Sequence, residues 1–234
     1  MTPHNIPLGT EKTAALRSIS AGYCEAEGGS HGPDHSERVY TLSLVMGREL
    51  QARQDILAAA ALLHDIGRRY ETESRGGICH ARKGAEMAAT ILKNLDFSPP
   101  DIAEITHCIK AHRFRSTEKP ATLEARILFD ADKLDSIGAV GIGRAFLFAG
   151  RIGAKLHDAE ADHTRTLSYS SEDTAYREFQ IKMSRVREQM LTPLGRQFAE
   201  SRHQFMEIFF DQLNREIYGL EKLARSDAIP GFIR

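Results

Sequence analysis

Two adjacent side chains that can bind a metal ion, His64 and Asp65, end an apolar segment of the chain. Residues 55–63 are almost entirely apolar, so we predict a helix buried on every side. Gly67 follows and is predicted to take a positive φ and end this helix. A buried imidazole beside a buried carboxylate is costly unless each has a partner, and a bound cation satisfies both. The dipeptide alone also fits a His–Asp hydrogen bond at a helix end.

Two more candidate metal ligands, His35 and Asp132, lie far from this pair in the sequence. His35 lies one helical turn before Val39, so its side chain is expected to point inward. Asp132 follows Leu128 by four residues and shares the apolar face of another predicted helix. Two imidazoles and two carboxylates suit a borderline-to-hard divalent ion, namely Mn, Mg, Fe, Co or Ni. Four protein ligands leave room for water and substrate oxygens, which is typical of a catalytic centre.

Further side chains that suit a metal or phosphate site accompany these four. His80 and His112 lie on or beside the inward stripes of two later predicted helices. Each is a candidate ligand of a second metal ion or a candidate contact for phosphate. Arg38 and Arg68 are the cations that we expect near a phosphate group, because guanidinium groups bind phosphate with two parallel hydrogen bonds.

The predicted helix that carries Asp132 holds two more carboxylates, Asp130 and Asp135, with Lys133 between them. Three carboxylates in six residues of an otherwise apolar helix require partners. Helix capping and surface ion pairs are the alternative explanation, and they suit Asp130 or Asp135 better than Asp132.

Helical periodicity dominates the chain, and no segment of useful length alternates with a period of two residues. We therefore predict an all-α fold in a single domain over residues 1–234, with a core at about 30–140 and a C-terminal helical extension at about 172–220. Residues 68–78 are expected to form a mobile loop over the site. The last helix is predicted to start at Thr192-Pro193 and to bury its large apolar residues. These are Leu194, Phe198, Phe205, Phe209, Leu213 and Ile217.

The composition excludes several classes of protein. The chain has 31 basic and 32 acidic residues and a formal net charge of −1, so no nucleic-acid duplex is expected as a partner. Three isolated cysteines without a CxxC pattern indicate a reducing compartment. No apolar run reaches the roughly 18 residues of a membrane span, and the N-terminus lacks the pattern of a signal peptide. We expect a cytoplasmic protein with no membrane contact.

The order of the four candidate ligands resembles that of the HD-domain superfamily of metal-dependent phosphohydrolases. The flanking residues agree in the segments Asp34–Val39, Leu62–Gly67 and Asp130–Gly138. The later segment Thr192–Met206 is similar to the tail of small stand-alone bacterial and archaeal members. The resemblance covers roughly residues 30–218.

This resemblance implies a helical HD bundle in which one metal ion is bound by His35, His64, Asp65 and Asp132. Members with histidines similar to His80 and His112 often hold two metal ions, whereas the subgroup with the matching tail more commonly holds one, so the number of ions stays open. The chain has no GYP tripeptide, and the resemblance therefore does not extend to the HD-GYP esterases of cyclic dinucleotides.

From the resemblance we expect hydrolysis of a phosphate ester or anhydride in a phosphorylated small molecule, with a nucleotide as the first choice and manganese among the expected ions. Asp65 is expected to bind the metal ion and orient a water molecule. Asp130 and Asp135 are expected to orient metal ligands or Lys133. Charge that develops on the phosphate oxygens would be offset by Lys133, Arg38 and Arg68.

Two other functions compete with this hypothesis. HD proteins with a two-iron site include oxygenases, and His80 and His112 would allow such a site. A non-catalytic module that binds nucleotides for regulation is the other alternative, although it would carry unpaired buried carboxylates if it bound no metal ion. The apolar stripe of the last helix would either fill the core or form the seam of a homodimer.

Overall fold

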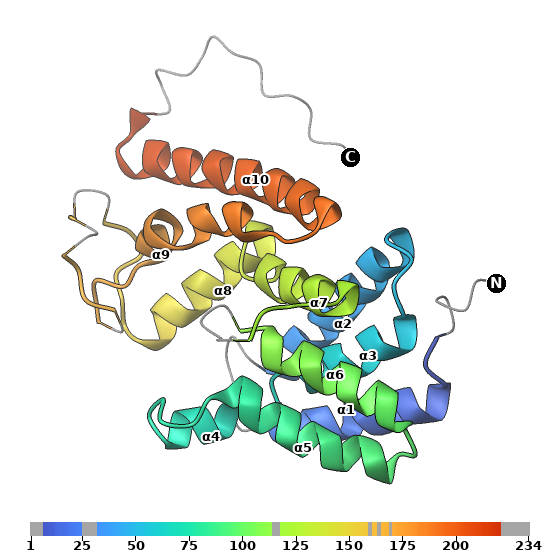
Figure 1. Cartoon of the computed structure of the whole chain (residues 1–234). Helices are drawn as coiled ribbons and strands as arrows, with labels where there is room; N and C mark the ends of the chain where they lie inside the picture. The colour runs from blue at the N-terminus through green and yellow to red at the C-terminus, as the bar shows by residue number, and fades with distance from the viewer. Residues whose placement is uncertain are drawn as a thin grey trace.

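The computed structural model describes residues 7–24, 32–113, 118–158, 161–162, 165–168 and 170–220. These residues form helices and turns with no strand among them, which confirms the all-α prediction (Figure 1). In chain order the helices are α1 (Thr10–Cys24), α2 (Pro33–Glu49), α3 (Gln54–Leu63), α4 (Arg68–Glu73), α5 (His80–Asn94), α6 (Pro99–Ala111), α7 (Leu123–Leu134) and α8 (Gly138–Arg151). They are followed by α9 (Ala175–Ile181), the 3₁₀ helix η2 (Met183–Gln189) and α10 (Pro193–Ile217).

Helix α3 forms the centre of the core. All of its residues except Asp55 are buried, as expected for a helix that is apolar on every side. Helices α1, α2, α6 and α7 pack around it. His64 and Asp65, which follow α3 directly, are therefore enclosed by the protein, with 0% and 1% of their surfaces exposed.

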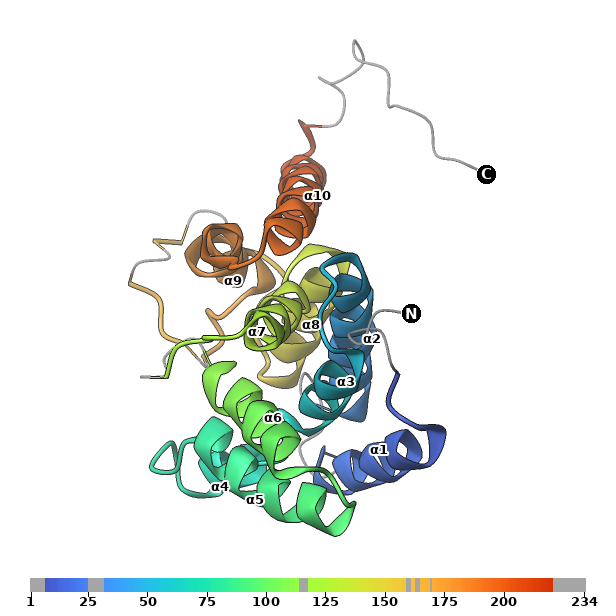
Figure 2. The ribbon, with the colours of Figure 1, turned by 45° about the vertical axis from the view of Figure 1, so that its right-hand side comes forward.

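Two helical hairpins, α2–α3 and α5–α6, account for much of the packing around the centre. Side-chain caps start two of the surrounding helices. The Ser98 hydroxyl accepts a hydrogen bond from the Asp101 amide at the start of α6, and the Thr122 hydroxyl accepts one from the Ala125 amide at the start of α7. Figures 1 and 2 both place α4, α5 and α6 at one end of the molecule and α10 at the other. No helix in the described part of the chain is long and apolar enough to cross a membrane.

The segment after Gly67 differs from the predicted loop. Residues Arg68–Glu73 form the short helix α4, which packs against α5. An ion pair one turn apart, Arg69 with Glu73, supports it. None of its residues is buried, and its polar composition explains why it was predicted to be a loop.

Gly67 does not take the positive φ that we predicted, since its φ is −87°. The glycine is explained instead by the lack of room for a side chain at this position. A Cβ atom at this position would lie 2.3 Å from the carbonyl oxygen of His80 and 2.6 Å from the amide nitrogen of Gly84. Gly67 therefore allows the end of α3 to approach the first turns of α5 closely.

The predicted apolar stripe of α10 is buried only in part, since four of its residues are partly buried against the core, namely Leu194, Phe198, Phe209 and Leu213. Phe205 and Ile217, predicted to be in the core, are 46% and 44% exposed. The residues that are buried lie on a neighbouring stripe: Gly195, Ala199, His203, Met206 and Phe210. The small residues let the first turns of α10 approach α7 closely, because a Cβ atom at Gly195 would lie 2.2 Å from Oδ2 of Asp130.

Candidate metal centre

The first cluster of possible metal ligands consists of His35, His64 and Asp132. The Nε2 atoms of His35 and His64 are 3.2 Å apart. Oδ1 of Asp132 lies 3.4 Å from His35 Nε2 and 3.9 Å from His64 Nε2. Three ligand atoms from α2, the end of α3 and α7 thus converge on one point, although the residues are almost a hundred positions apart in the sequence.

The local structure turns both imidazoles of the first cluster toward this point. His35 lies in the first turn of α2, and its Nδ1 atom lies 2.7 Å from Oδ2 of Asp135. His64 is the C-terminal cap of α3, and its Nδ1 atom lies 2.7 Å from the carbonyl oxygen of Ala61. Because both Nδ1 atoms are held by acceptors, both Nε2 atoms face Asp132.

The second cluster consists of Asp65, His80 and His112. The Nε2 atoms of His80 and His112 are 3.2 Å apart, and each lies 3.6 Å from Oδ1 of Asp65. Nδ1 of His112 lies 2.6 Å from the carbonyl oxygen of Ile109. Nδ1 of His80 is in contact with the carboxylate of Glu71.

Asp65 lies between the two clusters. Its Oδ2 atom is 3.7 Å from Nε2 of both His35 and His64, while its Oδ1 atom faces the second cluster. One carboxylate is therefore close enough to contribute a ligand atom to each cluster.

Both clusters are built on the same plan. Each helical hairpin supplies one histidine from the first turn of its first helix, His35 in α2 or His80 in α5. Each also supplies one histidine from the C-terminal cap of its second helix, His64 after α3 or His112 after α6. In each pair the first imidazole is held by a carboxylate and the second by a backbone carbonyl three residues earlier.

The spacing of these atoms fits a divalent ion at each cluster. Ligand atoms bound at about 2.0–2.2 Å to one ion lie roughly 3.0–3.5 Å from one another. The separations of 3.2, 3.4 and 3.9 Å in the first cluster and 3.2, 3.6 and 3.6 Å in the second are close to this range. Two imidazoles whose Nε2 atoms face each other and a carboxylate need a cation or a proton between them.

The ionisation of the first cluster suits such an ion. Burial opposes protonation of His35, but its hydrogen bonds with Asp132 and Asp135 outweigh that cost and raise its pKa to about 9. Burial lowers the pKa of His64 to about 4. Burial opposes ionisation of Asp132, but Lys133 and His35 outweigh it and hold the pKa of Asp132 well below its usual range. A proton on His35 thus occupies the place that a metal ion would take.

In the second cluster, burial and the charge of Arg68 hold the pKa of His80 well below its usual range. His80 is therefore neutral. Its single proton lies on the nitrogen that faces an acceptor, Nδ1 beside Glu71, which leaves Nε2 as a ligand atom.

Two predicted cations border the centre where it is partly open. The Nζ atom of Lys133 lies 2.5 Å from Oδ2 of Asp132 and donates to the carbonyl oxygen of His112 at 3.2 Å. Nε of Arg68 donates to Oδ2 of Asp65 at 3.1 Å. These lysine and arginine side chains are 17% and 25% exposed.

Arg38 differs from its predicted role as a contact for phosphate. Its guanidinium donates to both carboxylate oxygens of Asp135, at 2.7 and 3.1 Å, and to Asp34 at 2.5 Å. Arg144 also donates to Asp135, at 2.6 Å. Both arginines thus support the carboxylate that orients His35, and Asp135 lies where a ligand-orienting residue was predicted.

Asp130 does not have the predicted position beside the metal ligands. Its carboxylate accepts hydrogen bonds from the amides of Leu191 and Thr192, each at 2.8 Å, and from the Thr192 hydroxyl at 2.7 Å. The buried Asp130 therefore fixes the start of α10 against α7. The local sequence could not distinguish this role from that of Asp135, because the role of each carboxylate depends on contacts with residues far away in the sequence.

Two residues beside the second cluster, Glu71 and Arg113, were not predicted from the sequence. Nη2 of Arg113 donates to Glu71 at 2.6 Å, and Nη1 contacts the Sγ atom of Cys79 at 3.3 Å. Glu71 looked like part of a polar loop, and its partners lie on α5 and at the end of α6. A sequence signal for either residue requires knowledge of which helices pack together.

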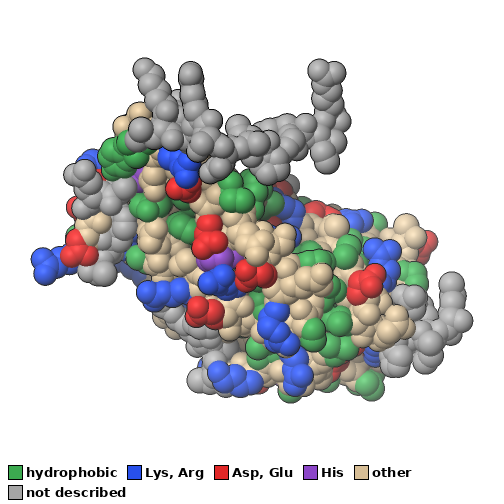
Figure 3. All heavy atoms as spheres, turned by 90° about the horizontal axis from the view of Figure 1, so that it is seen from above, with side chains coloured by type: hydrophobic (Ala, Val, Ile, Leu, Met, Phe, Trp, Pro, Cys, Tyr) green, Lys and Arg blue, Asp and Glu red, His purple; other side chains and the backbone are tan. Residues whose placement is uncertain are grey.

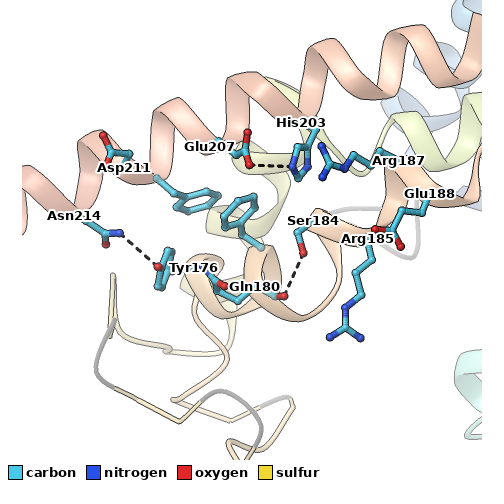
Figure 4. Close-up of a pocket in the computed structure, with 12 residues that line it drawn as sticks. Tyr176, Gln180, Ser184, Arg185, Arg187, Glu188, His203, Glu207, Asp211 and Asn214 are labelled. Atoms are coloured by element: carbon cyan, nitrogen blue, oxygen red, sulfur yellow. Dashed lines mark hydrogen bonds and ion pairs between the residues drawn. The ribbon is translucent and has the colours of Figure 1, made fainter. Parts of the chain in front are cut away.

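A separate surface hollow of about 510 Å³ lies between α9, η2 and α10 (Figure 4). Tyr176 and Asn214 lie toward one end of it, and His203 and Glu207 form an ion pair at 3.2 Å toward the other. None of the candidate metal ligands lines this hollow. Viewed from above, the molecule shows acidic, basic and apolar side chains mixed together, without a continuous surface of one charge (Figure 3).

Comparisons with known proteins agree with the metal centre that the geometry indicates. The model of the HD domain family matches residues 34–137. YpgQ of Bacillus subtilis is 32% identical over 200 residues, which cover 83% of this chain and 88% of YpgQ. The crystal structure of Bacillus subtilis YpgQ in complex with ADP matches with a TM-score of 0.68 and 27% identity, and covers 88% of this chain and 95% of that one.

A second solved structure, a predicted HD superfamily hydrolase from an uncultured Thermotogales bacterium, matches with a TM-score of 0.63 and 26% identity. It covers 92% of this chain and 95% of that chain. The likeness to YpgQ extends over most of both sequences. The segment of this chain that matches the family model, residues 34–137, contains every residue of the two clusters. This protein belongs to the HD-domain superfamily.

Proposed function

We propose that this protein is a metal-dependent phosphohydrolase that cleaves a phosphate ester or anhydride in a nucleotide. The observation that carries the proposal is the convergence of His35, His64 and Asp132 beside Asp65, at a centre bordered by two cations. The relative YpgQ has been crystallised with ADP, which supports a nucleotide as the substrate. Lys133 and Arg68 would then contact the phosphate groups.

The chain's own residues would have separate tasks in this reaction. When bound, a divalent ion polarises a phosphate oxygen and makes a water molecule more acidic. Asp65 would orient the attacking water, because its two oxygens face both clusters. Lys133 and Arg68 would offset the negative charge that develops on the phosphate oxygens. Asp135 would hold the orientation of His35 throughout.

We further propose that the second cluster binds a second ion. Its support is the shared plan of the two hairpins and the position of Asp65 between the clusters. The ion is expected to be Mn, Mg, Fe, Co or Ni, since nitrogen and carboxylate ligands in this mixture suit all of them.

Replacement of Asp132 tests the proposal. We expect Asp132→Ala to lose one bound ion and at least about 100-fold in hydrolysis of nucleoside mono-, di- and triphosphates with Mn²⁺, because the ligand set and the position of Lys133 are both disturbed. Asp211→Ala is the matched control, since Asp211 is exposed on α10 and pairs with Arg215. Full metal content and activity in Asp132→Ala would refute the proposal.

The same assays separate the two competing functions. A two-iron oxygenase, which the second cluster would allow, would retain iron and consume oxygen with organophosphonates or polyols while leaving nucleotides intact. A regulatory module would bind nucleotides without releasing phosphate from them.

A further inference from the structure

The two clusters share one plan but differ in the carboxylate that supports each. Asp135, which holds Nδ1 of His35, is 3% exposed and is itself fixed by Arg38 and Arg144. Glu71, which holds Nδ1 of His80, has a side chain that is 16% exposed and belongs to α4, a helix of six residues at the surface. The support of the first cluster is thus part of the core, while that of the second lies on a surface helix.

Glu71 is linked to both helices that carry the histidines of the second cluster. It contacts His80 directly, and it accepts a hydrogen bond from Arg113, the residue that follows His112. Arg113 in turn contacts Sγ of Cys79, the residue that precedes His80. One carboxylate therefore connects the end of α6 to the start of α5, which are the two places where the histidines of this cluster lie.

The contact with His80 also decides which nitrogen can bind an ion. A neutral imidazole carries one proton, and an acceptor at Nδ1 keeps that proton away from Nε2. Without the carboxylate of Glu71, the proton can move to Nε2, where it would face Oδ1 of Asp65 across 3.6 Å. The ligand position of His80 would then be occupied by hydrogen.

We infer that Glu71 is a positioning residue that controls the occupancy of the second cluster. The inference rests on the proposed function, because it requires both clusters to bind ions. It makes the loading of the second cluster sensitive to the position of α4.

The test is a titration of the full chain, stripped of metal with a chelator, with Mn²⁺. Free Mn²⁺ is followed by electron paramagnetic resonance, and the bound metal is counted by mass spectrometry. We expect two bound ions in the unchanged protein. Glu71→Gln should weaken one of the two sites about 10- to 100-fold and leave the other unchanged, the usual effect of removing a group that orients a metal ligand. At saturating Mn²⁺ its phosphohydrolase activity should return, because Glu71 positions a ligand and does not react.

Glu73→Gln is the matched control. Glu73 lies on the same helix, is exposed, and pairs with Arg69. It should leave both affinities unchanged. Glu71→Asp keeps the charge but withdraws the carboxylate from His80, and should also weaken the second site.

The possible results separate the inference from the proposal beneath it. A single bound ion in the unchanged protein would overturn the second ion of the proposed function and this inference with it. If both affinities are the same in Glu71→Gln as in the unchanged protein, the inference alone is overturned. The loss of both ions in that variant, or an equal effect of Glu73→Gln, would also overturn the inference alone. Thermal melting without metal checks that Glu71→Gln folds. If it does not fold, Glu71→Asp takes its place, and an unchanged affinity of the second cluster in that variant overturns the inference.

Discussion

His35 is the residue whose protonation competes with metal binding. Its Nε2 atom faces His64 and Asp132, and its Nδ1 atom faces Asp135. The pKa of about 9 means that both nitrogens carry protons at neutral pH before a cation binds. The raised pKa contributes stability to the ion-free protein that is present below about pH 6.5 and is lost as the pH rises through about 9. A metal ion must displace the proton on Nε2.

We therefore predict that metal binding at the first cluster releases about one proton at pH 7. The apparent affinity should rise about tenfold per pH unit up to about pH 9 and then level off, because above its pKa His35 no longer has a proton to lose. Calorimetric titrations with Mn²⁺ in buffers of different ionisation enthalpy measure the proton directly. Asp135→Asn should reduce the release, since it removes a carboxylate that raises the pKa of His35. An affinity that does not change between pH 7 and 9 would contradict this assignment.

The residues of the centre were predictable from the sequence to the extent that their positions depend on helical periodicity. His35, Asp132 and His80 lie on inward helix faces, and the structure brings them together with His64 and Asp65. Glu71 and Arg113 were not predictable, because each has its role through a partner on another helix. Burial can be inferred along one helix, whereas a contact between side chains on different helices depends on how the helices pack.

At the scale of elements, close approach of the backbone decided the points where sequence patterns failed. Gly67 was expected to end a helix through its positive φ, but it is needed because α3 and α5 approach each other there. On α10 the same effect selects Gly195 and Ala199 for the interface and leaves Phe205 partly exposed. Hydrophobic periodicity gives the most weight to large apolar residues. It therefore does not identify the most deeply buried face of a helix where small residues make the contact.

We predict that Gly67→Ala destabilises the protein by about 1–3 kcal/mol, because the added Cβ atom would overlap backbone atoms of His80 and Gly84 that cannot move independently of α5. The displaced α5 should also weaken Mn²⁺ binding at the second cluster more than at the first. Urea unfolding and the Mn²⁺ titration measure the two effects.

Gly143→Ala is the control for this prediction. Gly143 lies in α8, and a Cβ atom there would have no neighbour within 4 Å. Alanine should therefore leave the stability unchanged or raise it by up to about 1 kcal/mol, the difference in helix propensity. If Gly67→Ala proved as stable as Gly143→Ala, the close approach of α3 and α5 would not require glycine.

At the scale of the whole molecule, the candidate ligands come from separate parts of the chain. Those of the first cluster come from α2, the end of α3 and α7, and those of the second from the ends of α5 and α6 and from Asp65. α10 lies at the end of the molecule opposite α4–α6 and is joined to α7 through Asp130 (Figures 1 and 2). The unfolded chain would hold no such arrangement of ligands, so that metal binding and folding are linked.

This linkage predicts a rise in the melting temperature on addition of metal. An ion that binds only the folded state and is present at about 100 times its dissociation constant adds about 2.7 kcal/mol of stability. For a domain of this size that corresponds to an increase of about 5–11 °C, and a chelator should reverse it. Melting curves of the full chain with Mn²⁺ and with EDTA measure the change. Asp132→Ala should lose most of the increase while Asp211→Ala keeps it, because only the first of these variants removes a ligand. An equal increase in both variants would mean that Mn²⁺ stabilises the protein from a site outside the first cluster.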